Sequence, residues 1–187
     1  MQMIVLYGIG SLELNKNSRL QLSLAILMQK HFNWIGDIQV FDPVLSVTEC
    51  RVIKAFGCSI LSLHQYRRWR ALKPTLFFMP HCSSMLYSDF LKANWESSLL
   101  SNIVLFANSF NEYARKDPYR DLDSMWYLYG ARRFTKELRM NITFDEDYYN
   151  AFHRLTWHFF SQVKDAQLQS WNKFMNELSR RRVVIHE

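Results

Sequence analysis

A glycine turn that could hold a phosphate or a ribose stands near the start of the chain. Gly8, Gly10 and Ser11 follow a short apolar segment, and glycine lets a backbone turn tightly and approach a ligand closely. Asp42 follows the next apolar segment, where an acid can accept hydrogen bonds from ribose hydroxyls. The position for a third glycine holds Glu13, so the motif is shorter than a dinucleotide fingerprint. The turn therefore predicts either a nucleotide-like ligand or a bend needed only for packing.

A histidine beside a cysteine follows a later apolar segment, and a polar pair follows the next one. His81 and Cys82 together predict an acid or base, a thiolate, or a metal or haem ligand, because a neighbouring imidazolium lowers the pKa of a thiol. The competing interpretation is a hydrogen-bonded histidine and an inert buried cysteine. Neighbours on one loop rarely share a metal, so no metal site is predicted. Asn108 and Ser109 end a further apolar segment.

Strand and helix patterns alternate through about residue 110 and must position these side chains. Strands are predicted at 4–7, 38–41, 59–63, 75–79 and 103–107, and helices at 18–32, 48–56 and 86–100. In the first helix, Leu20, Leu24, Leu27 and Met28 recur on one face. The alternation predicts an α/β, Rossmann-like fold with a mainly parallel sheet of about five or six strands and flanking helices.

In open parallel sheets, ligands bind beyond the carboxyl ends of the strands, where the strand order reverses. With the order 3-2-1-4-5, the first and fourth strands are neighbours, and the polar residues that follow the strands converge. We therefore expect a ligand site formed by Gly8, Gly10, Ser11, Asp42, His81, Cys82, Asn108 and Ser109.

The later part of the chain is predicted to belong to the same domain. Residues 1–113 form the alternating core of a single domain over 1–187, and residues 114–187 form a mostly helical layer on it. Helices are predicted at 122–138 and 162–181, with a late strand at 155–160.

The charge and the cysteine content of the chain indicate which binding partners and which cellular compartment to expect. The net charge is +6, with basic runs at 67–70 and 180–182, which are more typical of solvated surfaces than of nucleic-acid sites. The three cysteines predict free thiols in a reducing compartment. A signal-peptide pattern and an apolar run long enough to span a bilayer are both absent. We therefore expect a cytoplasmic, possibly also nuclear, protein without a membrane span.

Several motifs together make the sequence resemble the "sensitivity to red light reduced" (SRR-like) family. They are Tyr7 to Ser11, Ser18 to Ala25, Phe41 to Val44, Leu76 to Cys82, Leu86-Tyr87, Asn94-Trp95, Asn108 to Phe110 and, more weakly, Ala151 to Phe160. Two departures stand out. His153-Arg154-Leu155 replaces the family's usual Asn-Asp-Thr, and this sequence begins directly at the first predicted strand, whereas family members usually carry an amino-terminal extension.

The resemblance implies a regulatory protein linked to circadian-clock input and to haem biosynthesis. It supplies no established reaction, and it implies either protein partners or a small ligand, with haem or a nucleotide-like molecule as the candidates. It says nothing of the oligomeric state. The alternative is a Rossmann-type enzyme with a cofactor site like that of adenosylmethionine-dependent methyltransferases, which the glycine turn and Asp42 favour. Against it, the fourth strand ends in Met-Pro-His-Cys rather than in an acid followed by two prolines.

Overall fold

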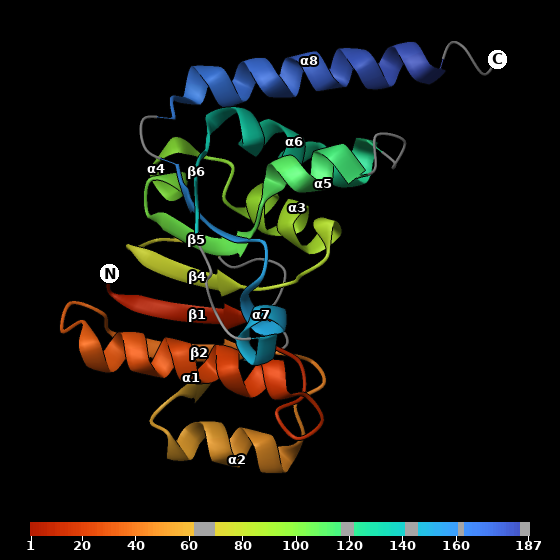
Figure 1. The fold of residues 1–187 in the computed structure, drawn as a ribbon. Coiled ribbons are helices and arrows are strands. Elements are labelled where there is room, and N and C mark those ends of the chain that lie inside the picture. The colour runs from red at the N-terminus through yellow and green to blue at the C-terminus, as the bar shows by residue number, and fades with distance from the viewer. Residues whose placement is uncertain (62–69, 117–121, 141–145, 161–162, 184–187) are drawn as a thin grey trace.

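A central sheet organises the computed structural model, which describes residues 1–61, 70–116, 122–140, 146–160 and 163–183 (Figure 1). The strands are β1 (Met3–Tyr7), β2 (Asp37–Phe41), β3 (Ser59–Ile60), β4 (Thr75–Met79), β5 (Ile103–Asn108), β6 (Lys136–Arg139) and β7 (Leu155–Phe159). Their order in space is β3-β2-β1-β4-β5-β7-β6. The first five are parallel, and β7 is antiparallel to both β5 and β6.

Helices cover both faces of this sheet, which gives three layers (Figure 1). They are α1 (Lys16–His31), α2 (Val47–Ala55), α3 (Ser84–Ala93), α4 (Ser97–Leu100), α5 (Phe110–Lys116), α6 (Leu122–Phe134), α7 (Glu146–Phe152) and α8 (Asp165–Val183). Side chains alternate across a strand, so Ile4 and Leu6 pack in one core with α1, α2 and α7. Val5 and Tyr7 point to the other face, into a core shared with α3, α5, α6 and α8.

The α/β class, the mainly parallel sheet and the order 3-2-1-4-5 of the five predicted strands are confirmed, but the sheet in the described residues has seven strands rather than five or six. The helix predicted at 122–138 is wrong at its end, because α6 stops at Phe134 and Lys136–Arg139 forms β6. Lys, Glu, Leu and Arg are good helix formers, but pairing with β7 overrides that local preference. The short helices α5 and α7 are not predicted by the sequence pattern.

The helix predicted at 86–100 is interrupted by Asn94, which is fully buried. Its side-chain oxygen accepts the Ala71 N–H at 2.8 Å, and its amide donates to the Phe90 carbonyl at 2.9 Å. Asparagine readily bonds backbone groups in this way, which ends a helix. The family motif Asn94-Trp95 therefore has a structural role at this bend.

The apolar face predicted for α1 is only partly buried, because Leu27 is 61% exposed. Two polar residues, Ser18 and Gln21, are buried instead. Ser18 donates its hydroxyl proton to the Ile9 carbonyl, and the Gln21 amide donates to the Ala151 carbonyl at 3.0 Å. These bonds tie α1 to the glycine turn and to the end of α7.

Several expectations fall wholly or partly outside the described residues. Of the basic run at 67–70 only Arg70 is described, and it forms a half-exposed ion pair with Glu96 at 2.7 Å. Residues 62 and 63 of the third predicted strand and the side chains of the run at 180–182 are also outside them. The thiols of Cys50, Cys58 and Cys82 are free. Within the described residues, the helices are too short or too polar to cross a membrane.

Candidate functional site

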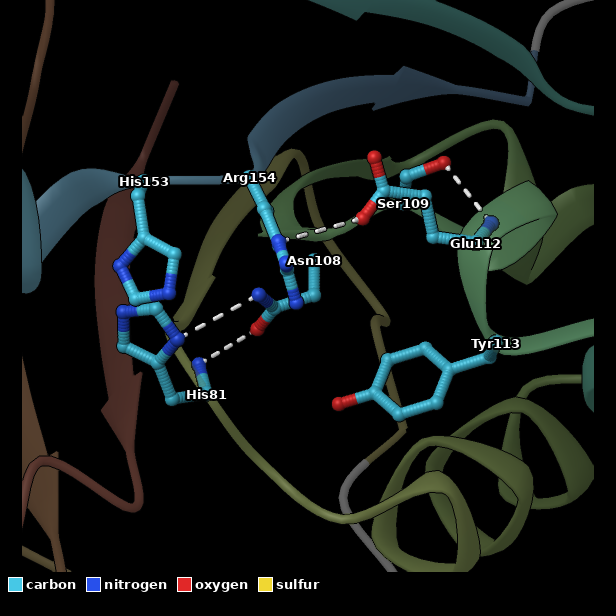
Figure 2. A pocket seen from close by; sticks show the side chains of 7 residues that line it. All are labelled: His81, Asn108, Ser109, Glu112, Tyr113, His153 and Arg154. Carbon is cyan, nitrogen blue, oxygen red and sulfur yellow. Dashed lines mark hydrogen bonds and ion pairs between the residues drawn. The ribbon is translucent and has the colours of Figure 1, made fainter. Parts of the chain in front are cut away.

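Two adjacent pockets open at the carboxyl edge of the sheet, where β1, β4 and β5 end, and Figure 2 shows the one that contains Arg154. The arginine pocket has a volume of about 210 Å³ and is lined by His81, Asn108, Ser109, Glu112, Tyr113, His153 and Arg154. The amide pocket has a volume of about 460 Å³ and is lined by Gly8, Ile9, Gly10, Asn15, Asn17, Gln21, Pro80, His81, Asn150 and His153. His81 and His153 line both pockets and so form the wall between them.

The two histidines in this wall are stacked, with ring centroids 4.8 Å apart (Figure 2). His81 has a positive φ of 54°, which is uncommon outside glycine and is often found at functional sites. Its N–H donates to Asn108 Oδ1 at 2.6 Å, so the loop after β4 is held by the end of β5. The Tyr87 hydroxyl supports the same junction by donating to the Met79 carbonyl at 2.5 Å.

Both ring nitrogens of His81 have partners. The Asn108 amide lies 3.3 Å from Nδ1, and Nε2 lies 3.2 Å from the Ala151 carbonyl. Because an amide nitrogen donates, the network assigns the proton to Nε2. Burial lowers the pKa of His81, and the nearby charges of His153 and Arg154 act in the same direction, so its neutral form is favoured. In this arrangement the imidazole serves as a neutral pocket wall.

Arg154 places a positive charge in the arginine pocket (Figure 2). It lies in the turn between α7 and β7 with a φ of 61°, and its side chain is half exposed. Its Nε is 3.8 Å from Glu112 Oε2, a long distance for an ion pair, and Glu112 also pairs with Arg139 at 3.4 Å. A guanidinium that is only loosely paired can still bind a carboxylate or a phosphate.

The segment that departs from the family pattern thus lies directly at the site. The site predicted from the sequence does not include His153 or Arg154, although His153-Arg154-Leu155 departs from the family pattern, and it does not include Glu112 or Tyr113. Only the departure itself could have drawn attention to His153 and Arg154. Leu155 is buried in the sheet as the first residue of β7.

The backbone N–H groups of the glycine turn already donate hydrogen bonds to other parts of the protein, so the turn is closed to a ligand. Asp42 Oδ2 accepts the Gly10 N–H at 2.7 Å, and Oδ1 accepts the Val44 N–H at 2.9 Å. The Gly8 N–H donates to the Phe41 carbonyl at 3.1 Å. A phosphate on this turn would compete with the Asp42 carboxylate for Gly10 and be repelled by it. This geometry favours the packing interpretation of the turn.

Cys82 is buried beneath the glycine turn, and its thiol lies 3.5 Å from the Tyr7 carbonyl, to which it donates. Burial raises the pKa of this thiol, and the negative charge of Asp42 raises it further. The expectation that an imidazolium lowers the Cys82 pKa is therefore wrong. A haem iron needs a free imidazole nitrogen or a thiolate. His81 and Cys82 offer neither in this geometry, so they do not fit haem.

Ser11 faces away from both pockets toward Glu49, a buried residue of α2. Glu49 Oε1 accepts the Ser11 hydroxyl at 2.6 Å and the Glu13 N–H at 2.9 Å, while Oε2 accepts the Ser46 N–H at 2.6 Å. Hydrogen bonds from Ser11, Glu13 and Ser46 lower the pKa of Glu49 to about 2, against the effect of burial. Ser11 therefore anchors the loop between β1 and α1.

We expect Glu49→Gln to lower the free energy of unfolding at pH 7 by about 1–3 kcal/mol, because a glutamine amide cannot accept all three bonds. The folded pKa lies below the ordinary value of 4.5, so the carboxylate's contribution is complete above that pH and disappears as the pH falls toward 2. Urea unfolding at pH 7 and pH 3 measures both effects. Glu96→Gln, in an exposed ion pair, is the control and should change stability by less than about 1 kcal/mol. An equal loss in both variants would refute the assignment.

Ser109 contributes to the pocket wall, but its hydroxyl is directed to a largely buried carboxylate on β6, that of Glu137. It donates to Glu137 Oε2 at 2.6 Å, while the Phe110 N–H donates to Oε1 at 2.9 Å. His158, fully buried on β7, has its Nε2 3.5 Å from the same Oε1. Glu137 therefore joins the start of α5 to the antiparallel end of the sheet.

The family-model match and the most similar known proteins point to the same family. The SRR1 domain matches residues 1–159 of this chain. The Arabidopsis thaliana protein named "SENSITIVITY TO RED LIGHT REDUCED 1" is 48% identical over 168 residues, which are 88% of this chain and 61% of that protein. A Mus musculus "SRR1-like protein" is 34% identical over 108 residues, which are 57% of this chain and 43% of that protein.

A Drosophila melanogaster "SRR1-like protein" is 28% identical over 162 residues, which are 87% of this chain and 56% of that protein. The chain thus spans less than two thirds of the length of these relatives. No solved structure matches it. Since the domain match extends over residues 1–159 and agrees with the motif resemblance, the chain belongs to the SRR1 domain family.

Proposed function

We propose that this chain is a regulatory protein that responds to a small polar ligand bound across the arginine and amide pockets. The name of the Arabidopsis relative indicates a role in sensitivity to red light, and we extend such a role to this chain. By the family resemblance, the regulated processes are circadian-clock input and haem biosynthesis. Regulation of haem synthesis does not require haem as the ligand, and His81 and Cys82 do not fit it.

The observation that carries the proposal is the pair of polar pockets that share the stacked wall of His81 and His153. One pocket offers a guanidinium, and the other is lined by four side-chain amides. A matching ligand carries an acidic group for Arg154 and hydrogen-bonding groups for the amides. A nucleotide-like molecule has this chemistry, with its phosphate at Arg154 rather than at the closed glycine turn.

Binding is tested by thermal shift against adenosine monophosphate, NAD, adenosylmethionine and haem, followed by calorimetry. A ligand of the folded state raises the melting temperature, and we expect adenosine monophosphate to do so. Arg154→Gln should weaken that binding at least tenfold without lowering the melting temperature of the free protein, since its side chain is half exposed. Arg70→Gln, at another half-exposed ion pair, is the matched control and should bind normally. Equal binding by both variants would exclude the arginine pocket.

The regulatory role is tested in Arabidopsis plants that lack the related protein. The wild-type chain should restore sensitivity to red light, whereas Arg154→Gln should fail at equal protein abundance. Full restoration by Arg154→Gln would separate the regulatory role from this pocket, and no restoration by the wild-type chain would count against the role itself.

A second candidate is an adenosylmethionine-dependent enzyme, which the strand order favours. An order of 3-2-1-4-5-7-6 with only the seventh strand reversed is typical of Rossmann-like methyltransferases, and it is the order of the strands in the described residues. In this case adenosylmethionine binds at the glycine turn, and Asp42 releases Gly10 to accept ribose hydroxyls. Gly10→Val should then abolish binding while Arg154→Gln retains it, which distinguishes the two candidates.

A further inference from the structure

A groove of about 630 Å³ lies between α6 and α8, and Figure 1 shows α8 running across α6 at the outer surface of the molecule. Tyr129, Arg132 and Arg133 form its α6 wall. Side chains three and four positions apart share one side of a helix, so both arginines stand beside Tyr129. This α6–α8 groove is lined by a different set of residues from the arginine and amide pockets.

The α8 wall of the groove is an apolar stripe. It consists of Trp171, Phe174, Met175 and Leu178, and this spacing places them on one face of the helix. Trp171 and Met175 are buried, whereas Leu178 is half-buried and Phe174 is 47% exposed. One edge of the stripe is therefore packed into the protein, and the other edge remains open to solvent in the groove.

Gly130 brings α8 close to α6 and so fixes the floor of the groove. A Cβ at Gly130 would lie 2.4 Å from Trp171 Nε1, so only glycine leaves room for this ring. Trp171 Nε1 donates to the Trp126 carbonyl at 3.3 Å, which holds the ring in place. Arg133 lies over the same ring with its Cζ 5.5 Å from the centroid, a distance typical of a cation–π contact.

The positive charges of Arg132 and Arg133 are not neutralised by the protein. Both side chains are exposed, and within the described residues neither forms an ion pair or a side-chain hydrogen bond. The contact with Trp171 restrains the Arg133 guanidinium, which lowers the entropy lost when a partner binds. Each guanidinium can hold a carboxylate through two parallel N–H donors.

The charges around the groove favour an acidic partner. In the part of the chain that the structure describes, no carboxylate lines the groove, so its lining carries the two positive charges of Arg132 and Arg133. Glu112 on the neighbouring α5 is already engaged by arginines at the carboxyl edge of the sheet. Glu177 lines a separate hollow on another side of α8 together with Lys173, and these two charges cancel. The net charge of +6 on the whole chain acts in the same direction.

The apolar side chains of the groove favour a peptide over a nucleic acid. Single-stranded nucleic acids bind by stacking successive bases on exposed aromatic rings. Trp171 is only 8% exposed and lies beneath Arg133, and Tyr129 is half-buried, so Phe174 offers the one open ring of the described lining. Phe174 and Leu178 can instead receive an apolar side chain of a peptide, beside the two arginines that would hold its carboxylates.

We propose that the α6–α8 groove binds an acidic segment of a protein partner that carries an apolar anchor. The anchor packs against Phe174 and Leu178, and carboxylates on either side of it pair with Arg132 and Arg133. The α8 wall begins at Asp165, beyond residues 1–159 that the SRR1 domain matches. Because the groove and the ligand pockets are formed by different residues, the protein can hold a partner and a small ligand at the same time.

The test uses two designed peptides of twelve residues that share the same leucines and carry either glutamate or glutamine at the remaining positions. We expect the glutamate peptide to bind the full chain at micromolar concentration in fluorescence anisotropy, at least tenfold more tightly than the glutamine peptide. A single-stranded oligouridylate of twelve nucleotides is the nucleic-acid probe, and it should bind at least tenfold more weakly than the glutamate peptide.

Variants locate the binding on this surface. Arg132→Gln combined with Arg133→Gln should weaken the glutamate peptide at least tenfold, whereas Arg51→Gln, at an exposed arginine of α2, should change its affinity by less than twofold. Phe174→Ser should weaken it at least fivefold, and Phe56→Ser is the matched control, because Phe56 is also exposed but lies on α2 side of the sheet. Melting temperatures confirm that each variant is folded.

Three results would overturn the proposal. The first is equal binding of the glutamate peptide to wild type and to the double arginine variant, or no binding to wild type. The second is tighter binding of the oligouridylate that depends on Arg132, which would make the groove a nucleic-acid site. The third is sedimentation showing a wild-type dimer that Phe174→Ser dissociates, because a second copy of the chain would then occupy the groove.

Discussion

Replacing Glu137 with alanine is expected to lower the free energy of unfolding by about 3–5 kcal/mol at pH 7. The substitution leaves the Ser109 hydroxyl, the Phe110 N–H and the fully buried His158 without their shared acceptor. A single domain is stable by only about 5–15 kcal/mol, so this change removes a large share of the total. Urea unfolding followed by circular dichroism measures the loss.

The pH dependence of this loss separates a charge effect from lost packing. Burial alone would raise the pKa of Glu137, but hydrogen bonds from His158 and Ser109 outweigh it and lower the pKa to about 2. The folded pKa is below the ordinary 4.5, so the carboxylate stabilises fully above that pH, and the contribution disappears as the pH falls toward 2. The difference between wild type and Glu137→Ala should therefore shrink between pH 5 and pH 2.

Glu177→Gln on an exposed part of α8 is the control, and its effect should stay within about 0.5 kcal/mol at every pH. A Glu137→Ala variant that is as stable as wild type at pH 7 would contradict the hydrogen-bonded cluster. A large loss that is independent of pH would assign the role of Glu137 to packing instead.

Replacing Gly8 with alanine is expected to cost about 3 kcal/mol of stability. Gly8 has a φ of 67°, and a Cβ there would lie 2.7 Å from Cys82 Sγ. Two effects therefore add: the left-handed backbone, at roughly 1–2 kcal/mol, and the overlap with a buried sulfur, at roughly 1–3 kcal/mol. Thermal and urea unfolding measure the sum.

The two effects can be separated within this chain. Gly57 has a φ of 82° with no atom within 4 Å of an added Cβ, so Gly57→Ala bears the backbone strain alone. The Cys82 contact is tested by the double variant Gly8→Ala/Cys82→Ala, which should be more stable than the sum of the two single changes predicts. Equal losses in Gly8→Ala and Gly57→Ala, with simple additivity in the double variant, would show that the glycine turn does not rest on Cys82.

The sequence predicts the parallel half of the sheet well because the signals there are local and agree with one another. The strands at 4–7, 38–41 and 75–79 are short apolar runs, each bounded by a turn residue, and strands covered on both faces have this pattern. The strand β6 has no such signal, since it reads Lys-Glu-Leu-Arg and is mostly exposed. Its conformation depends on pairing with β7, which follows later in the chain.

The candidate site likewise has a part that the sequence predicts and a part that only the folded structure specifies. The sequence alone determined that Gly8, Asp42, His81 and Asn108 would meet at one edge of the sheet, because strand order places the ends of β1, β2, β4 and β5 together. Only the tertiary structure decided what each does there. Asp42 closes the glycine turn, and burial keeps the neighbouring Cys82 thiol protonated.

Tertiary structure also brought His153 and Arg154 to the pockets from a turn that follows Asn108 by more than forty residues. Sequence patterns report periodicity and the turn residues that bound each element, so they place the backbone of a sheet and the residues at its strand ends. Hydrogen-bond partners, burial and charge at a site depend on residues that are distant in the sequence, and these are specified only when the chain is folded.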